Sequence, residues 1–535
     1  MSHWPILPLI VPLLAGSLLL VLDQAPLALR RAVGIVATFL LLLVAIRLLA
    51  LACEAPQVYY LGDWPAPFGI VLVLDRLSAL MLAVTAVLAV ASVVYAAVGD
   101  DARGPHFHAL FQFQLLGVNG AFLTGDLFNL FVFFEVLLIA SYCLLMHSPA
   151  PERTRAALHL VVLNLTGAAL FLIALGIIYA TAGTLNMADL AGRVAAAPAD
   201  SKGLVHAGGL LLLVVFGLKA AVVPLGFWLP RAYSVCPASV ACLFAVMTKV
   251  GVYAIIRVHL MIYGAADDST SGGFASLAAP WLMPSALLTI VLGTIGLLAA
   301  LSLRAAIAYL VVISTGTLLA GVGLFTRDAI AAALFYLVHS TLITGGLFLL
   351  ADLIARQRGA ARDRFDRAQT VTQPALIGAL FFAGAVAIAG LPPMSGFLTK
   401  VMLLQAGMDS HWMVWLWAVV LGSGGLVLVS LSRSGSALFW RTGDALPVNA
   451  PPVNAPPINA PPVNAPPAKV RGGIIDIGPT VALLGCGALL VVLARPMTAY
   501  TVATADQLHD RQVYIDAVLA NSGVSIPASL RETSK

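Results

Sequence analysis

Four ionisable side chains lie deep inside apolar stretches of this chain. Lys219, Lys249 and Lys400 each fall in a stretch long enough to cross a bilayer, and Glu135 lies in a fourth. A charge at the bilayer centre costs about 3 kcal/mol on insertion scales, so residues of this kind indicate a function or a specific partner. Burial favours the neutral form of a lysine, whereas a nearby carboxylate favours its charged form. A lysine with a movable acidic partner can therefore bind and release a proton near neutral pH.

The spacing of these groups suggests a pair and a relay. Glu135 has no cation within helical reach in its own stretch, and Lys219 is the first choice for a partner on another helix. Lys249 comes 30 residues after Lys219 and is predicted to be the next stop. His339 can change charge near neutral pH and lies between Lys249 and Lys400 in the sequence, so it is the candidate for a bridge. The competing interpretation is structural: a buried lysine can donate a hydrogen bond between helices, and a neutral histidine can simply pack.

The composition places these residues in a membrane. Of 535 residues, 61% are hydrophobic and 10% are charged, and the mean hydropathy of +0.99 excludes a soluble globular protein. Apolar stretches of membrane-spanning length recur throughout, and we count roughly fourteen. We therefore predict an all-α polytopic membrane protein. The stretches are approximately 5–22, 30–52, 70–98, 107–124, 126–147, 156–181, 203–230, 237–263, 279–301, 303–324, 328–355, 374–408, 412–440 and 474–494.

Two of the predicted spans contain helix-breaking residues beside a lysine. Pro224 follows Lys219 by five residues, and a proline inside a helix removes a hydrogen bond and clashes with the preceding turn. The stretch 374–408 would be about 50 Å long as a straight helix, too long for the hydrocarbon core. It contains Pro392 and Pro393 in the sequence GLPPMSG, so it too is predicted to be interrupted.

Breaks at corresponding places in two halves are typical of inverted-repeat transporters. We predict two five-helix repeats, helices 4–8 and 9–13, with helices 7 and 12 broken; the alternative is that the prolines only kink their helices. The expected units are helices 1–3 (1–106), the first repeat (107–263), the second repeat (279–440), a linker (441–473), helix 14 (474–494) and a tail (495–535). The linker repeats Asn-Ala-Pro-Pro and is predicted to be an extended or disordered cytoplasmic segment.

Loop charges predict the orientation. With the amino terminus outside, the inward loops hold sixteen lysines and arginines and the outward loops three. The positive-inside rule then places both termini on the outer side of the cytoplasmic membrane. The strongest element of this asymmetry is a cluster made of Arg356, Arg358, Arg362, Arg364 and Arg367.

Three motifs carry a resemblance to a known family. The segments TGDLFNLFVFFEVLLIASY (124–142), KAAVVPLGFWLP (219–230) and GLPPMSGFLTK (390–400) resemble the D-type subunit of the Mrp-type multisubunit Na⁺/H⁺ antiporters. That family is related to the antiporter-like subunits of respiratory complex I and of membrane-bound hydrogenases. The span 308–316 lacks the histidine that some relatives have there, and the Asn-Ala-Pro-Pro tract is not an expected family feature.

The resemblance implies fourteen helices with the two inverted repeats and the two broken helices. It also implies roles along a central polar axis. Glu135 and Lys219 form a pair whose opening drives proton movement, Lys249 connects the half-channels, and Lys400 ends the proton path. His339 matches the region of the broken helix 11.

These observations predict a proton-translocating subunit of a bacterial Na⁺/H⁺ antiporter, driven by the proton gradient and working inside a hetero-oligomer. Its partners would be the other subunits, protons, Na⁺ and the lipid bilayer, and no nucleic acid. The sequence has no nucleotide-binding loop, metal cluster or redox ligand set, so we expect no enzyme activity, no cofactor and no metal. One alternative is a proton-pumping subunit of a complex I type NADH–quinone oxidoreductase or membrane-bound hydrogenase. Another is a lipid-modifying or scaffold protein, which would tolerate substitution of Lys219.

Overall fold

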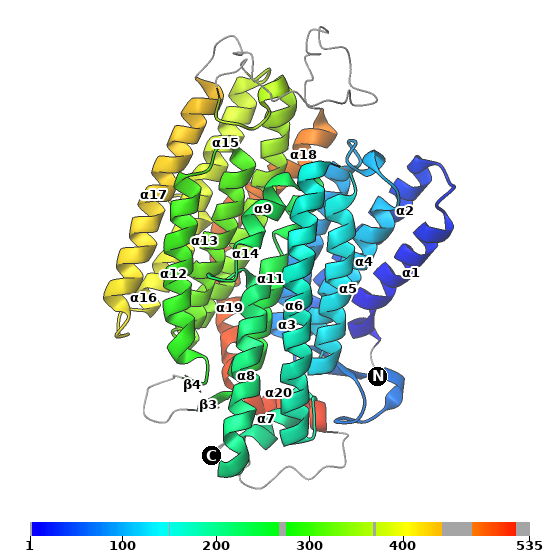
Figure 1. The fold of residues 1–535 in the computed structure, drawn as a ribbon, viewed down its shortest axis with the longest axis vertical. Helices are drawn as coiled ribbons and strands as arrows, with labels where there is room; N and C mark the ends of the chain where they lie inside the picture. Colours follow the sequence, from blue (N-terminus) through cyan, green and yellow to red (C-terminus); the bar gives the residue numbers. More distant parts are fainter. Residues whose placement is uncertain (1–2, 149, 267–273, 367–370, 441–472, 521–535) are drawn as a thin grey trace.

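The computed structural model describes residues 3–148, 150–266, 274–366, 371–440 and 473–520. Almost the whole predicted linker 441–473, Arg367 of the arginine cluster and the last part of the predicted tail lie outside these ranges. Helices dominate the described residues and run side by side along the long axis of the molecule (Figure 1). The prediction of a helical polytopic membrane protein is confirmed.

The helices of the first half follow the predicted spans closely. They are α1 (Leu7–Val21), α2 (Leu27–Leu51), α3 (Arg76–Ala96), α4 (Phe107–Leu123), α5 (Leu127–Met146), α6 (Pro151–Ala182), α8 (Ala199–Ala220) with α9 (Trp228–Val235), and α10 (Ala238–Phe244) with α11 (Met247–Ile255). A π-helical turn, Ile256–Leu260, extends α11. The short α7 (Met187–Ala195) connects α6 to α8 outside the predicted spans.

The second half contains α12 (Ala279–Leu298), α13 (Leu303–Val322), α14 (Arg327–Gln357), α15 (Pro374–Ala389) with α16 (Ser395–Ala406), α17 (Met413–Phe439) and α18 (Ile474–Val492). Twelve spans in the described residues are long and apolar enough to cross a membrane. The two other predicted spans are α4, with 17 residues, and the interrupted pair α15 and α16. Whether the halves are inverted repeats stays a prediction.

Two short strand pairs qualify the all-α prediction. Strand β1 (Gln57–Tyr60) pairs antiparallel with β2 (Val71–Leu74), with Gln57 opposite Leu74. Strand β3 (Gly264–Ala266) pairs with β4 (Phe274–Ser276) in the same sense. Both pairs lie in connections between spans, where backbone groups outside helices must find partners of their own.

The interior is formed by two spans that are buried along their whole apolar length. These are the α10–α11 span and α14, whereas α1, α2, α6 and α17 expose many large apolar side chains on their outer faces. A helix that is apolar all round is expected at the centre of a membrane bundle. Lys249 and His339 lie on the two buried spans, so protein rather than lipid surrounds both side chains.

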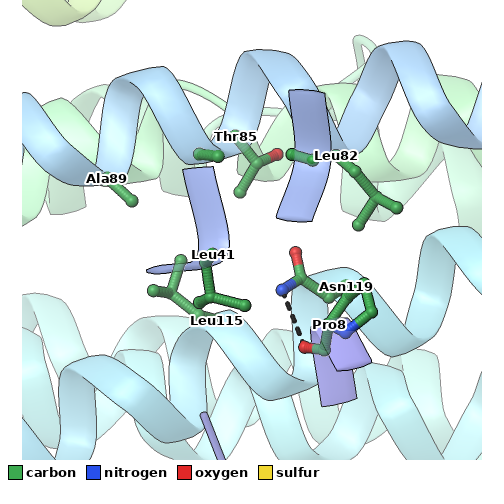
Figure 2. Close-up of a pocket in the computed structure, with 9 residues that line it drawn as sticks. Pro8, Leu41, Leu82, Thr85, Ala89, Leu115 and Asn119 are labelled. Carbon is green, nitrogen blue, oxygen red and sulfur yellow. Dashed lines mark hydrogen bonds between the residues drawn. The ribbon is translucent and has the colours of Figure 1, made fainter. Parts of the chain in front are cut away.

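The first span packs onto α4 through a small polar contact. Figure 2 shows Asn119 of α4 donating from Nδ2 to the carbonyl of Pro8, at 3.0 Å, beside Thr85 of α3. The cavity there, about 10 Å³, is close to the smallest that holds one water. The contact therefore joins helices and leaves no room for a larger ligand.

The chain beyond α18 folds back as two helices. The sequence predicts no secondary structure for this tail. Helix α19 (Ala494–His509) packs on α14 and α3, and α20 (Arg511–Leu519) packs on α7 and β1. The Tyr500 hydroxyl donates to the carbonyl of Arg76 at 2.9 Å, and the Tyr60 hydroxyl donates to the carbonyl of Val518 at 3.0 Å. Helix α20 lies at the end of the bundle where α1 begins (Figure 1).

A buried ion pair lies under these carboxyl-terminal helices. Asp75 caps the first turn of α3, and its carboxylate contacts the Arg257 guanidinium at 2.6 Å. The two side chains are only 3% and 2% exposed, and Arg257 also stacks on Tyr253 and on Tyr514 of α20. In the sequence, Asp75 and Arg257 lie towards the ends of spans, a position that favours an end-capping pair or snorkelling. The capping pair is confirmed, but Arg257 is enclosed rather than snorkelling.

Replacing Asp75 with Asn should destabilise the protein strongly. The amide keeps a capping oxygen but leaves the Arg257 charge buried without its counter-ion, which costs about 3–5 kcal/mol. Thermal unfolding of the detergent-solubilised protein would measure the loss. The matched control is Asp506→Asn, which breaks the exposed pair with Arg327 and should cost at most about 1 kcal/mol. Equal effects of the two substitutions would contradict a special role for burial.

Candidate functional site

Lys219 is buried near the carboxyl end of α8 and is held by an amide. Its Nζ donates to Oδ1 of Asn164 on α6 at 3.1 Å, and it lies 5.9 Å from the centre of the Phe134 ring on α5. The residue is 5% exposed. Asn164 in turn donates from Nδ2 to the carbonyl of Leu160 at 2.9 Å, which orients its oxygen towards the lysine. Sequence reasoning missed Asn164, although an asparagine inside an apolar span is itself a signal.

Glu135 lies on α5, half-buried, on the helix that also supplies Phe134. Glu135 directly follows Phe134, whose ring centre lies 5.9 Å from Lys219 Nζ. Among the described residues, however, no ion pair within 4.0 Å joins Glu135 to Lys219. The structure therefore places Lys219 beside the helix that carries Glu135, but its hydrogen bond goes to Asn164. Asp126 caps the start of the same helix, because its side chain accepts from the backbone N–H of Asn129 at 2.8 Å.

The break in the seventh span comes where it was predicted, just after Lys219. Helix α8 ends at Ala220, and Ala221 takes a left-handed conformation with φ 61°. Partners from the surroundings satisfy the freed backbone: Trp228 Nε1 donates to the carbonyl of Leu218 at 3.0 Å, and Val223 N–H donates to Thr289 Oγ1 on α12 at 3.0 Å. Pro224 lies in this interruption, and it cannot supply the N–H that a continuous helix needs.

Lys249 is fully buried in the first turn of α11. Its Nζ donates to Oγ of Ser314 on α13 at 3.1 Å, and the Ser314 hydroxyl donates onward to the carbonyl of Val311 at 2.7 Å. Ser314 belongs to the span 308–316, which lacks the histidine present in some relatives of the resembled family. A serine thus provides a direct contact from Lys249 to the second predicted repeat.

His339 and Lys400 each contact a residue beside the break in the twelfth span. The break lies at Pro392 and Pro393, between α15 and α16, as predicted. The ring of His339, fully buried on α14, has Nδ1 at 2.8 Å from Oγ of Ser395 at the start of α16. Lys400 is partly exposed and donates from Nζ to the carbonyl of Ala389 at 2.8 Å.

Gly390 shapes the pocket of Lys400. Its φ of +81° favours glycine, and a Cβ added there would lie 2.7 Å from Cδ of Lys400. Lys400 therefore depends on a glycine for its position against the broken helix.

The two breaks share an electrostatic arrangement. Lys219 lies in the last turn of α8, and Lys400 binds the carbonyl of the last residue of α15. Both ammonium groups therefore lie at the carboxyl end of the first half of a broken helix, where unpaired carbonyls and the helix dipole favour a cation. Discontinuous helices offer such ends at membrane depth only where protein or a cavity surrounds them.

The three lysines differ in their partners from the arginines that form ion pairs, although the buried Arg358 also donates to backbone carbonyls. Arg257, Arg304 and Arg356 each contact a carboxylate. In the described residues, the lysines instead donate to an amide, a hydroxyl and a backbone carbonyl, all of them neutral. A lysine with a neutral acceptor can lose its proton without leaving a carboxylate unpaired. The arrangement therefore suits reversible protonation.

Close packing fixes Lys219 and Lys249 relative to one another. A Cβ added to Gly251 of α11 would lie 2.5 Å from the backbone N of Ala220 and 2.9 Å from the carbonyl carbon of Lys219. Gly251 is two residues from Lys249, so α8 and α11 touch backbone to backbone beside both lysines. Small residues at such contacts are what allow membrane helices to approach this closely.

The sequence of this chain matches a known protein family over the region that contains these residues. Residues 124–425 match the family model described as NADH:quinone oxidoreductase/Mrp antiporter, transmembrane. The chain belongs to this family. The match includes the site residues on α5, α8, α11, α14 and α16, and it confirms the resemblance seen in the motifs.

Curated relatives in this family are antiporter subunits. The chain is 40% identical to the D-type subunit of a probable K⁺/H⁺ antiporter of Rhizobium meliloti (strain 1021), over 97% of this chain and 98% of that protein. It is 34% identical to the D-type subunit of the Na⁺/H⁺ antiporter of Alkalihalophilus pseudofirmus, over 97% of this chain and 100% of that protein. Among solved structures, a chain of the Mrp complex from Dietzia sp. DQ12-45-1b aligns with a TM-score of 0.84 and 28% identity, over 97% and 100% of the two chains. These likenesses make the protein a cation/proton antiporter-type membrane subunit.

Replacing Gly251 with Ala should destabilise this family member by about 1–3 kcal/mol, because the methyl group must push α11 away from α8. Gly176→Ala on α6 is the matched control: a Cβ there meets nothing within 4 Å, and alanine favours the helix. Thermal unfolding should show a loss for the first variant and none for the second. If Gly251→Ala unfolds like the wild type, the backbone contact at Lys219 does not hold the helices.

Proposed function

We propose that this chain is the proton-translocating subunit of a multisubunit monovalent cation/proton antiporter driven by the proton gradient. The observation that carries the proposal is the set of three lysines in the apolar interior, each donating to a neutral oxygen. A transporter subunit needs groups that change charge inside the membrane, whereas a structural cation is better served by a fixed carboxylate.

In the proposed mechanism, Lys219 alternates between two acceptors. Bound to Asn164, the ammonium faces a neutral dipole, and loss of its proton is comparatively easy. A small movement of α5 or α8 that brings the Glu135 carboxylate to the ammonium stabilises the charged form instead. Opening and closing of the Glu135–Lys219 pair then takes up a proton and releases it.

The remaining groups extend this step into a relay across the two predicted repeats. Lys249 exchanges protons with Lys219, whose helix packs against α11 at Gly251. The Ser314 hydroxyl supports passage from Lys249 to the second repeat, because a hydroxyl both accepts and donates. His339 then connects to Lys400, where the path ends beside the break of the twelfth span. In the described residues, no contact is recorded between Lys249 and His339, and the relay needs water or side-chain motion between them.

Na⁺ is the proposed exchanged cation, and the subunit is proposed to work inside a hetero-oligomer of the cytoplasmic membrane with both termini outside. Relatives named for K⁺/H⁺ and for Na⁺/H⁺ exchange both align along almost the whole chain, so transport assays need both ions. The family also includes NADH:quinone oxidoreductase subunits, which makes a proton-pumping subunit of a redox complex the second candidate. Cation-dependent proton flux without any electron donor favours the antiporter over the redox pump.

Replacing Lys219 or Glu135 with Ala should abolish cation-dependent proton flux. Lys219→Ala removes the group that carries the proton, and Glu135→Ala removes the carboxylate that stabilises it. Everted vesicles containing the assembled complex, with Na⁺ or K⁺ added, would report the flux by fluorescence quenching. Lys202→Ala, an exposed lysine on the same helix, is the control and should behave as the wild type. Wild-type flux in either test variant, with assembly shown by co-purification, would refute the proposal.

Replacing Ser314 with Ala should slow the flux about tenfold, since a buried donor without its acceptor costs about 1–3 kcal/mol. Ser314→Thr keeps the hydroxyl and should retain most of the flux. The same vesicle assay, with rates normalised to the amount of complex, separates the two variants. If alanine and threonine have the same effect, the hydroxyl contact to Lys249 is not on the proton path.

A further inference from the structure

A cavity of about 210 Å³ lies at one end of the helix bundle, away from the buried lysines. It is bordered by segments distant in sequence: the turn after α3, the first turn of α6, the start of α10, the start of α13, and the end of α14 with the turn that follows. All of these segments lie in or beside the loops predicted to face the cytoplasm. Its charged lining consists of Arg103, Arg153, Arg304, Arg356, Arg362 and Asp352.

The carboxylates near this cavity do not balance its arginines. Asp352 accepts from Arg304 Nη2 at 2.6 Å and from Arg356 Nε at 2.6 Å, and it also accepts from the Tyr95 hydroxyl at 2.8 Å. Two further carboxylates stand nearby: Asp100, 3.2 Å from Arg103, and Asp363, which accepts from a backbone N–H. Five arginines against three carboxylates leave two positive charges in excess. Asp352 already accepts three hydrogen bonds and has little capacity left for more.

Some of the guanidinium donors have no partner. Arg304 Nε and Arg356 Nη2 are buried and make no hydrogen bond within the described residues. Arg362 is exposed, and within the described part of the chain its side chain has no recorded ion pair. Buried polar groups are almost always hydrogen-bonded, so unpartnered donors around an excess of positive charge indicate a missing acceptor. Guanidinium groups match oxyanions particularly well, because each offers parallel N–H donors.

We propose that this arginine cavity binds a phosphate-class oxyanion. The volume exceeds that of several waters, each about 30 Å³, and it accommodates a phosphate group with its hydration. The phosphate can belong to a soluble compound or to the headgroup of an anionic phospholipid, since both present the same oxygens to the arginines. Bound there, the anion links the ends of α6, α13 and α14, which belong to the two predicted repeats.

Two arginines allow a test with little risk to folding. Arg362→Ala removes an exposed charge, and Arg356→Lys keeps the charge beside Asp352 but loses the forked donors. Arg364→Ala is the control, because this arginine lies in the same turn, is 59% exposed, pairs with Asp366 and does not line the cavity. Each variant is purified as the full complex, with assembly checked by co-purification.

Binding is measured in two arms. In the first, inorganic phosphate is titrated calorimetrically into the complex in a neutral detergent at low ionic strength. In the second, the complex is reconstituted into phosphatidylcholine vesicles with or without phosphatidylglycerol, and retained lipid is quantified by native mass spectrometry. Each test variant should weaken binding about tenfold, which corresponds to the loss of one hydrogen bond between charged groups. Arg364→Ala should leave it unchanged.

The arms distinguish the sources of the phosphate. Variant-sensitive binding of inorganic phosphate supports a soluble ligand, and variant-sensitive retention of phosphatidylglycerol alone supports a lipid headgroup. Wild-type complex that binds neither overturns the proposal. Binding that Arg362→Ala and Arg356→Lys leave unchanged overturns it as well, because the anion would then lie elsewhere.

Discussion

The constraint on which the structure depends is that an ammonium group inside an apolar bundle must have an oxygen to donate to. Lys219, Lys249 and Lys400 obtain theirs from Asn164, Ser314 and the carbonyl of Ala389. The Lys400 arrangement depends on an interrupted helix, because the end of α15 exposes a carbonyl group that a continuous helix would consume. Lys219 lies beside the other break, at the end of α8, although its own acceptor is a side chain. The breaks in the seventh and twelfth spans are therefore part of the site.

The same constraint explains why polar groups gather on the most buried spans. Lys249 and His339 lie on spans that other helices surround along their whole length, where no lipid reaches them. Glycines keep these spans close enough for short hydrogen bonds. Gly251 brings α11 against the backbone at Lys219, and Gly390 gives Lys400 space beside the broken α15.

Charges in this protein fall into two groups that differ in how they are neutralised. Arg257 and Asp75 form a closed pair beneath the carboxyl-terminal helices, and such a pair holds its charge permanently. The lysines along the interior donate to neutral oxygens, and the proposed function assigns the changes of charge to them. The arginines around Asp352 form an intermediate case, because they are only partly neutralised by the protein itself. Arginines paired with carboxylates thus lie towards the ends of the bundle, and the lysines that donate to neutral oxygens lie within it.

The sequence by itself determined the class of protein, most of the spans, both helix breaks and the ionisable residues, because hydropathy, proline and glycine act locally and their effects are readable along the chain. It also carried the family, through motifs around Glu135, Lys219 and Lys400. Only the tertiary structure decided which residues accept hydrogen bonds from the lysines. Asn164 and Ser314 are 55 and 65 residues from the lysines they bind, and no local pattern encodes contacts at that separation. The enclosure of Arg257 by Tyr514 likewise depends on the folding back of α20, and the arginine cavity depends on segments from five parts of the chain meeting at one end of the bundle.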